Sequence, residues 1–523
     1  FTTTGGAYKL ARYRWAWRKR AVADSANNYT NLFNLVTAVN LTGSALVPQV
    51  ENQVDVENWM RVFALQHIVG NWDAYGYNRG KNCYVYKPLN GRFGMIPWDI
   101  DMVLGSGSDG PTTDIFGAND PIVTRLWNTP AFRRAYLRAY SDAVAGPLQN
   151  ARFDPIVDGR HSALRANGVT VADPRPIKSW VAQRRAYLAN RVAGMDVKDF
   201  AITSNGGNDW STGQLQVTLS GTAPIAIKTI ELNGAVMPVT WTSATSWSAL
   251  VALGGRTNVL SLVGYDSRGA PVAGASDTVR VIYTGTDLPA AADQVVINEI
   301  MYHPLAPNAA FIELCNTSAT APFDLSGWRL GGVGFTFPSG VVLGPGGFAV
   351  VASNRDGFAA AYGFDVLPVG EFPGNLQNDG ERLRLLRPGA TPEADELVDE
   401  VRYANEPPWP VQADGWGPSL QLIDPRQDNW RVGNWAAAHP GDAVVATPGK
   451  PNSVVKALPP FPPLFVNEVQ PQNVSGPVDR FGDRDPWIEL HNPGTNQIDL
   501  SGFFLTSAYT NLTEWAFSVG TRR

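Results

Sequence analysis

The hydrophobic pattern of this chain changes its period near residue 200, and that change limits the folds the chain can adopt. Before residue 200, apolar residues recur at helical spacing, as in YTNLFNLVTAVN (29–40) and VENWMRVFALQHIVGNW (56–72). After SNGGND (204–209), the composition turns to Thr, Ser, Val and Gly in short alternating runs. Such runs are typical of strands. The sequence therefore predicts a multidomain chain, with an α+β part first and all-β domains after it.

The first part, residues 1–200, is predicted to hold helices around one short hairpin. Helical spacing continues in PAFRRAYLRAYSDAVAGPLQ (130–149) and IKSWVAQRRAYLANRVA (177–193). Between the helices, NCYVYKP (82–88) and GRFGMIPWD (91–99) are short, aromatic and β-branched. A Leu-Asn-Gly turn joins these two runs, which indicates a hairpin.

The second part is predicted to be an immunoglobulin-like β-sandwich over residues 203–287. Five alternating runs follow one another at roughly ten-residue spacing with turn residues between them: LQVTLSG, IKTIELNG, WSALVAL, NVLSLVGYD and TVRVIYTG. The segment TDLPAAAD (286–293) is predicted to be a linker.

An internal repeat occupies the rest of the chain. VINEIMYHP…FIELCNTSATAPFDLSGWRL, from Val296, matches FVNEVQPQN…WIELHNPGTNQIDLSGFFL, from Phe465. The repeat predicts two copies of one β domain, over 291–455 and 462–523, with the second copy truncated. The Pro-rich segment ALPPFPPLF (457–465) between the copies indicates a stiff spacer.

Composition excludes several classes of protein. A length of 523 residues predicts three or four domains, and a net charge of −5 does not favour nucleic-acid binding. No run approaches the roughly 18 apolar residues of a membrane helix. Cys83 and Cys315 are far apart, so we expect free buried thiols and neither a disulfide framework nor a zinc site. The chain begins and stops within patterned sequence, so we expect a piece of a longer protein.

The stretch from Asn71 to Gly105 gathers acids and amides around the predicted hairpin. Asp73 precedes the hairpin, Asn82 opens its first strand, and Asp99 and Asp101 follow its second strand. Phosphoryl transfer needs carboxylates and an amide that hold divalent metal against phosphates, and an acid that orients the incoming hydroxyl. Extended backbone would place Asp99 and Asp101 on one face. The alternative from spacing alone is that Asp73 and Asp99 are turn and cap residues.

This stretch resembles the spore coat protein H (CotH) kinase family, through NWD…NCYVYKPLNGRFGMIPWDIDMVLG, the preceding VDVENWMRVFALQHIVG and the later NTPAFRRAYLRAYSD. The resemblance covers residues 1–200. It implies an atypical protein-kinase-like fold that binds ATP with Mg²⁺ or Mn²⁺ and phosphorylates Ser or Thr of coat or secreted proteins.

The resemblance also implies roles for individual residues. Asp73 corresponds to the catalytic aspartate, which orients the hydroxyl and accepts its proton. Asp99 corresponds to the metal-binding aspartate, Asn82 to a second metal ligand, and Asp101 to either a metal ligand or a structural acid. The neighbouring Pro97 and Trp98 are expected to fix the turn by packing.

Two departures from the family pattern concern Cys83, which stands where an aromatic is usual, and a long, glycine-rich loop between Asp73 and Asn82. A kinase also needs a nucleotide-covering lobe with a phosphate-contacting lysine. No strand for that lobe precedes Phe1, so we expect the N-terminal lobe to be missing and this piece alone to be inactive.

Two other features have simpler explanations. The segment YKLARYRWAWRKRA (8–21) mixes basic and aromatic residues as single-strand nucleic-acid binders do, but we favour an amphipathic segment of the kinase-like part. His67, on the helix that leads into the acidic stretch, is predicted to be a core or capping histidine.

The repeat resembles the lamin tail domain, an immunoglobulin-like β-sandwich appended to secreted enzymes and surface proteins in bacteria. The recurring polar residues could bind calcium, but we favour turn capping and pairing within the sandwich. They are Asn298, Glu299, Glu313, Asn316 and Asp324 in the first copy, and Asn467, Glu468, Glu489, Asn492 and Asp499 in the second.

Together these features predict a secreted or cell-surface atypical protein kinase that transfers the ATP γ-phosphate to Ser or Thr of extracellular or coat proteins. Its β domains would attach it to a surface or to an extracellular matrix partner, with no nucleic acid and no membrane span involved. The alternative is a non-catalytic adhesion or scaffold protein with a degenerate kinase-like module.

Overall fold

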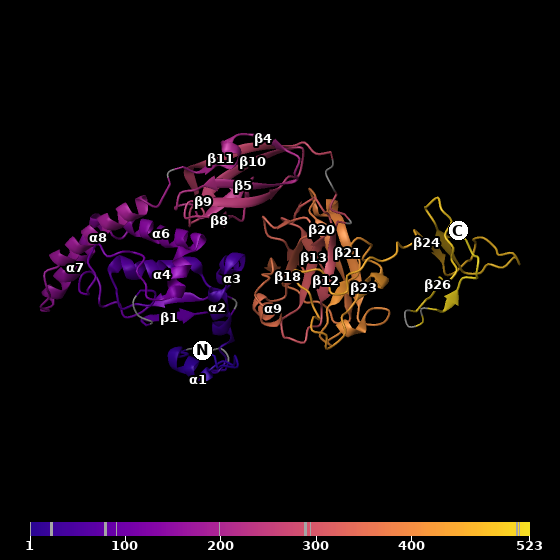
Figure 1. Ribbon diagram of the computed structural model, residues 1–523, viewed down its shortest axis with the longest axis horizontal. Coiled ribbons are helices and arrows are strands. Elements are labelled where there is room, and N and C mark those ends of the chain that lie inside the picture. Colours follow the sequence, from indigo (N-terminus) through magenta and orange to yellow (C-terminus); the bar gives the residue numbers. More distant parts are fainter. Residues whose placement is uncertain are drawn as a thin grey trace.

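The computed structural model describes residues 2–20, 25–77, 81–89, 91–197, 199–286, 290–292, 294–508, 511 and 513–522. We refer to residues up to 197 as the helical part, 199–286 as the sandwich, 294–455 as the first β copy and 462–522 as the second β copy. In Figure 1 the helical part lies at the left, the sandwich above it, and the two β copies follow toward the right. The structure confirms the fold class, an α+β part followed by all-β parts.

The helical part contains the predicted helices and hairpin. Its elements are α1 (Leu10–Ala16), α2 (Thr30–Asn40), α3 (Leu46–Gln53), α4 (Val56–Val69), β1 (Cys83–Tyr86), β2 (Gly94–Pro97), α5 (Pro121–Asn128), α6 (Pro130–Ala145), α7 (Asn150–Ala166) and α8 (Arg175–Ala193). Helices α3, α5 and α7 were not predicted from the sequence; of these, α7 is the longest. That helix buries no residue, so it has no apolar stripe to detect. No helix in the described ranges is both long and apolar enough to cross a bilayer.

The central helix α4 has sharp ends that place the acidic stretch. At its N-terminus the Asp55 side chain accepts a hydrogen bond from the Asn58 backbone N–H at 3.0 Å. At its C-terminus Gly70 takes a left-handed φ of 70°, and Asn71 is fully buried. The Asn71 amide donates to the Gln66 side chain of the last turn at 2.9 Å, so the chain that leads to Asp73 leaves the helix in a fixed direction.

The hairpin is antiparallel and packs against the start of α4. Cys83 is paired with Pro97 and Tyr86 with Gly94. The Asn58 side chain accepts a hydrogen bond from the Met95 backbone N–H at 2.6 Å. Met95 is buried in the core of the helical part, together with the fully buried Phe63. This bond to α4 and a shared core therefore hold the hairpin in place.

The sandwich consists of two sheets. One has the strand order β4-β11-β10-β6-β7 and the other β3-β5-β9-β8. The fully buried Leu219 and Val281 belong to its core. Residues 287–289 and 293 of the predicted linker lie outside the described residues. The strands are β3 (Ala201–Ile202), β4 (Trp210–Thr212), β5 (Gln216–Thr222), β6 (Thr229–Leu232), β7 (Ala235–Val236), β8 (Thr240–Trp241), β9 (Ser246–Ala252), β10 (Thr257–Tyr265) and β11 (Pro271–Tyr283).

The first β copy is built mainly from a six-stranded sheet, β19-β18-β13-β12-β22-β23, and a four-stranded sheet, β16-β15-β20-β21. Helix α9 connects the parallel pair β18 and β19. The elements are β12 (Val295–Met301), β13 (Phe311–Asn316), β14 (Phe323–Asp324), β15 (Arg329–Gly331), β16 (Phe335–Thr336), β17 (Val342–Leu343), β18 (Phe348–Ala352), α9 (Arg355–Tyr362), β19 (Gly370–Glu371), β20 (Gly380–Arg387), β21 (Glu396–Ala404), β22 (Leu420–Leu422) and β23 (Trp435–Ala436).

The second β copy repeats the first at the level of the backbone. Its strands are β24 (Phe465–Gln470), β25 (Trp487–His491), β26 (Phe504–Leu505) and β27 (Trp515–Ala516). The pairing of β24 with β25 shifts register around Asn467, as the pairing of β12 with β13 does around Asn298. This shared irregularity supports the interpretation that one type of domain occurs twice. The domain boundaries remain predictions.

The parts contact one another through buried polar side chains. Arg134 of α6 enters the sandwich, where its guanidinium donates to the backbone carbonyls of Ala223, Pro224, Ile227 and Ala244. Figure 1 shows α9 of the first β copy facing the helical part near α2 and α3. There Asp356 accepts from the Lys87 ammonium at 2.6 Å and from the Gln53 amide at 2.8 Å.

Candidate functional site

The open end of the hairpin brings two of the predicted site residues close in the fold. The Trp98 backbone N–H donates to the Asn82 carbonyl at 3.0 Å, which extends the strand pairing one step past Cys83 and Pro97. Asp99 follows Trp98 directly. Asn82 and Asp99 therefore lie at the same end of the hairpin, as the sequence predicted.

Asp73 lies at this end as well and contacts Asn82. The Asn82 amide donates to the Asp73 backbone carbonyl at 2.7 Å and to its carboxylate at 3.4 Å. Lys81 forms an ion pair with the Asp73 carboxylate at 2.7 Å, and that carboxylate is 18% exposed. Lys81 was not among the predicted site residues. Lys81 lies eight residues after Asp73 in the sequence, so their ion pair can be inferred only when the loop between them is known to fold back.

The backbone at this end takes an uncommon conformation. Asn82 has a φ of 62°, Asp99 a φ of 55° and Leu104 a φ of 54°. Left-handed φ is tolerated by Asn and Asp but is a true outlier for Leu. The Leu104 backbone N–H donates to the Val69 carbonyl of α4 at 2.8 Å, which holds this conformation. Such outliers tend to cluster at functional sites.

Asp99 and Asp101 are exposed and lie beyond the end of β2 at Pro97. The left-handed φ of Asp99 means that the backbone there is not extended, so the expected shared strand face does not apply. The Ser106 hydroxyl donates to the Asp101 carbonyl at 3.1 Å. Within the described ranges, no three side chains of His, Cys, Asp or Glu lie together as a metal-binding group.

Trp98 packs against the protein only in part. Its ring is 58% exposed and meets Tyr84 edge to face, with 5.5 Å between ring centroids. We expected Trp98 to fix the turn by packing; its ring packs against Tyr84 but is otherwise largely exposed. An exposed aromatic ring beside Asp99 is available to a bound molecule.

Helix α8 packs against the acidic stretch and the segments next to it. Its buried Arg184 donates to the backbone carbonyls of Pro111 at 3.1 Å and His67 at 2.7 Å. Its Trp180 lies against Gly70 and Gly105, where an added Cβ would come within 3.0 Å of the indole. Neither α8 residue could be predicted as a support of this stretch, because a contact so distant along the chain leaves no local signal.

His67 is part of the core, as predicted. Its ring is 2% exposed and packs edge to face against Tyr77 and Trp127. Burial, followed by the nearby positive charge of Arg184, lowers the pKa of His67 to about 3. The imidazole is therefore neutral at physiological pH and is a structural group.

Both cysteines are free thiols, as predicted; Cys315 is buried as expected, whereas Cys83 is only partly buried. Burial raises the pKa of Cys83 to about 11 and that of Cys315 to about 12, with the Glu313 charge as a further cause at Cys315. Neither residue is a thiolate at neutral pH, so neither is a nucleophile.

The recurring acids of the first β copy pair with protein donors. Glu299 and Glu313 are cross-strand partners with no exposed surface. Glu299 accepts from the Ser419 hydroxyl at 2.5 Å and from the Thr447 backbone N–H at 2.8 Å. Glu313 accepts from the Asn298 amide at 2.9 Å. These bonds favour pairing within the sandwich over calcium binding.

The second copy repeats some of these bonds in an exposed setting. The Asn467 amide donates to the Glu489 carboxylate at 2.5 Å. The Asp499 carboxylate accepts from the Ser501 backbone N–H at 2.9 Å, as Asp324 accepts from the Ser326 backbone N–H at 2.9 Å. The shared Asp-x-Ser turn is therefore a structural cap in both copies.

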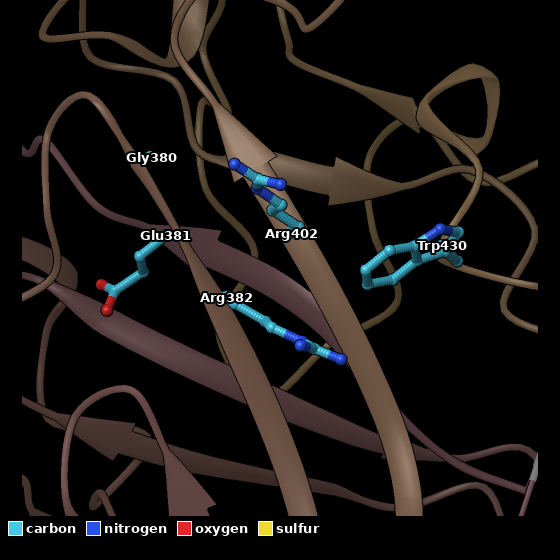
Figure 2. Close-up of a pocket in the computed structure, with 5 residues that line it drawn as sticks. All are labelled: Gly380, Glu381, Arg382, Arg402 and Trp430. Atoms are coloured by element: carbon cyan, nitrogen blue, oxygen red, sulfur yellow. The ribbon is translucent and has the colours of Figure 1, made fainter. Parts of the chain in front are cut away.

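Two pockets in the described structure lie away from the acidic stretch. One, of about 670 Å³, lies between the helical part and the sandwich and includes Glu57, Asp142 and Lys228. The other, of about 450 Å³, lies on β20 and β21 and is drawn in Figure 2.

The helical part carries an acidic hairpin end and is followed by β-sandwiches. Residues 9–188 match the family model described as CotH kinase protein, and residues 289–405 match the Lamin Tail Domain model. The chain therefore combines a CotH segment with a lamin tail domain, as the sequence predicted.

Other comparisons add little. No curated protein matches the chain. Among solved structures, it is similar to the Bacteroides ovatus mixed-linkage glucan utilization locus protein SGBP-B, solved in complex with a mixed-linkage heptasaccharide. The identity is 10% and the TM-score 0.11, over 36% of this chain and 38% of that chain. A likeness this slight carries no argument about fold or ligand.

Proposed function

We propose that the full-length protein is a secreted or surface atypical protein kinase that transfers the γ-phosphate of ATP to Ser or Thr of extracellular or coat proteins. The observation that carries the proposal is the meeting of Asp73, Asn82 and Asp99 at one end of the hairpin, inside the segment that matches the CotH family. The β domains would attach the enzyme to a surface or matrix partner.

The residues present fit a divalent metal with nucleotide phosphates. Asn82, Asp99 and Asp101 offer oxygen donors, which Mg²⁺ and Mn²⁺ prefer. Mg²⁺ is commonly held by one or two protein carboxylates plus the phosphates of the substrate. One or two ligands from this set would therefore be enough once the phosphates complete the coordination. When bound, the metal would neutralise charge on the phosphates.

Asp73 would orient the substrate hydroxyl and accept its proton. The Asn82 amide and the Lys81 ammonium both contact Asp73 and fix the position of its carboxylate. The exposed Asp99 and Trp98 lie on the side where a nucleotide could approach from solvent.

A second candidate is a non-catalytic surface scaffold with a degenerate kinase-like module. One observation favours it: the Asp73 carboxylate is already engaged by Lys81 and Asn82, as a purely structural turn residue would be. In that case the β domains would carry the function, and the acidic stretch would only shape the hairpin end.

The test is phosphorylation with labelled ATP by the full-length protein, with Mg²⁺, with Mn²⁺ and with chelator. Asp73→Asn and Asp99→Ala should each lower incorporation at least 100-fold. Asp142→Asn, an exposed acid paired with Arg61 away from the hairpin, should leave it unchanged. Metal-dependent label that persists in both site variants would contradict the proposed site, and no label from folded protein would favour the scaffold.

A further inference from the structure

The outer face of the β20–β21 hairpin carries an unusual pair of like charges. Arg382 of β20 and Arg402 of β21 are direct cross-strand partners, and both side chains are exposed. Like charges directly opposite each other destabilise a sheet. A nearby negative charge would offset this repulsion. In the described structure, one of the two arginines has a carboxylate partner and the other does not.

Arg382 is neutralised within the protein. Its guanidinium makes a bidentate pair with the Glu400 carboxylate, at 2.6 and 2.7 Å. Glu381 contributes nothing to the other arginine, because its carboxylate accepts from the Tyr403 hydroxyl and the Gln377 backbone N–H. Figure 2 shows the Glu381 carboxylate directed away from Arg402 and Trp430. In the described structure, Arg402 makes no ion pair or side-chain hydrogen bond.

An exposed indole forms the opposite wall of the pocket. Trp430 is 49% exposed, and the Arg382 guanidinium lies 5.9 Å from its ring centroid. In Figure 2 Trp430 lies across from the two arginines. A large apolar ring left half in water is available for stacking.

The loop that bears Trp430 is fixed by its neighbour. Asn429 is 3% exposed, and its amide donates to the Asp399 carboxylate at 2.7 Å. The Asp428 side chain accepts from the Trp430 backbone N–H at 2.9 Å. The backbone at Trp430 is thus set before any ligand arrives, which lowers the ordering cost of binding.

We infer that this pocket binds an acidic polysaccharide, one whose sugar rings carry carboxylates. Its volume of about 450 Å³ suits one or two sugar units. A sugar ring presents a flat C–H face to Trp430, and its carboxylate forms a bidentate pair with Arg402. A neutral sugar would leave Arg402 without a partner. A phosphoserine peptide would supply charge but no flat ring for Trp430. The inference stands apart from the proposed kinase activity.

The experiment is isothermal titration calorimetry on the full chain with a galacturonic acid hexamer. Cellohexaose tests for a ring without charge, polyglutamate for charge without a ring, and a phosphoserine peptide for the competing class of ligand. Trp430→Ala and Arg402→Ala should each weaken hexamer binding at least tenfold. Arg384→Ala, on the same face but outside the pocket, should change it less than threefold.

Tight binding of the hexamer alone, lost in both pocket variants, supports the inference. It is overturned if the hexamer does not bind, if polyglutamate or the phosphoserine peptide binds equally well, or if both pocket variants bind as the wild type does. Circular dichroism of each variant separates a lost pocket from a lost fold.

Discussion

The buried acid pair of the first β copy should make the stability of that copy depend on pH. Burial, followed by the charge of the neighbouring Glu299, raises the pKa of Glu313 to about 9. A glutamate in an unfolded chain has a pKa of about 4.3. Between those two values the folded state keeps a proton on Glu313 that the unfolded state has released. The free energy of unfolding therefore falls as pH rises.

The size of the effect follows from the linkage between proton binding and folding. One proton retained only by the folded state changes the free energy of unfolding by about 1.4 kcal/mol per pH unit. The loss should be about 3 kcal/mol between pH 6 and pH 8, absent below about pH 4 and complete near the folded pKa. Glu313→Gln keeps the shape and an acceptor for the Asn298 amide but does not titrate, so it should remove most of this dependence.

Hydrogen exchange measured by mass spectrometry on the full chain can follow this one region. Peptides covering β12 and β13 report the opening of the strands that carry Glu299 and Glu313. After correction for intrinsic exchange, wild-type protection should fall about 100-fold from pH 6 to pH 8. Glu489→Gln, at the exposed counterpart in the second copy, is the matched control and should leave β12 and β13 unchanged.

Two results would refute the reasoning. Wild-type protection that is equal at pH 6 and pH 8 would show that Glu313 does not hold a proton in the folded state. A Glu313→Gln variant with the full wild-type slope would place the titrating group elsewhere.

Three further changes test contacts described above. Arg134→Ala leaves several backbone carbonyls of the sandwich without a donor and should cost about 3 kcal/mol or more; an unchanged thermal midpoint would contradict this. Asp356→Ala leaves the ammonium of Lys87, whose side chain is 9% exposed, without its ion-pair partner. The loss should lower the free energy of unfolding in urea by about 2 to 3 kcal/mol, and adding Lys87→Met should restore most of it. Purely additive effects of the two substitutions would argue against the pair. Asp55→Ala removes the N-cap of α4 and should cost about 1 kcal/mol, with faster exchange in its first turn as the signature; wild-type exchange there would count against the cap.

Local patterns predicted the framework of the site. The helical spacing before Asp73, the aromatic strands and the turn between them were enough to place α4 and the hairpin, because each depends on contacts between residues close in sequence. The closeness of Asn82 and Asp99 followed from the hairpin alone. The repeat predicted the backbone likeness of the two β copies for the same reason.

The long-range contacts that position the site could not be predicted from local patterns. Arg184 and Trp180 hold the acidic stretch from a helix more than 70 residues away, and nothing near either residue marks the contact. Trp98 is largely exposed, and the backbone at Asn82 and Asp99 is left-handed; no hydrophobic pattern in the sequence encodes either feature. Ion pairs between distant parts of the chain likewise leave no hydrophobic pattern in the sequence.

The hairpin that carries the candidate site is fixed at both ends by different parts of the chain. At one end, Asn82 contacts Asp73. Beyond the other end, Lys87 binds Asp356 of α9, and in the sequence the whole sandwich lies between these two residues. A piece of chain that stops after residue 200 would leave the Lys87 ammonium and the Gln53 amide without their acceptor. Any shortened chain used to test the proposed phosphoryl transfer should therefore extend through α9, because the helical part alone would lack these contacts to the hairpin.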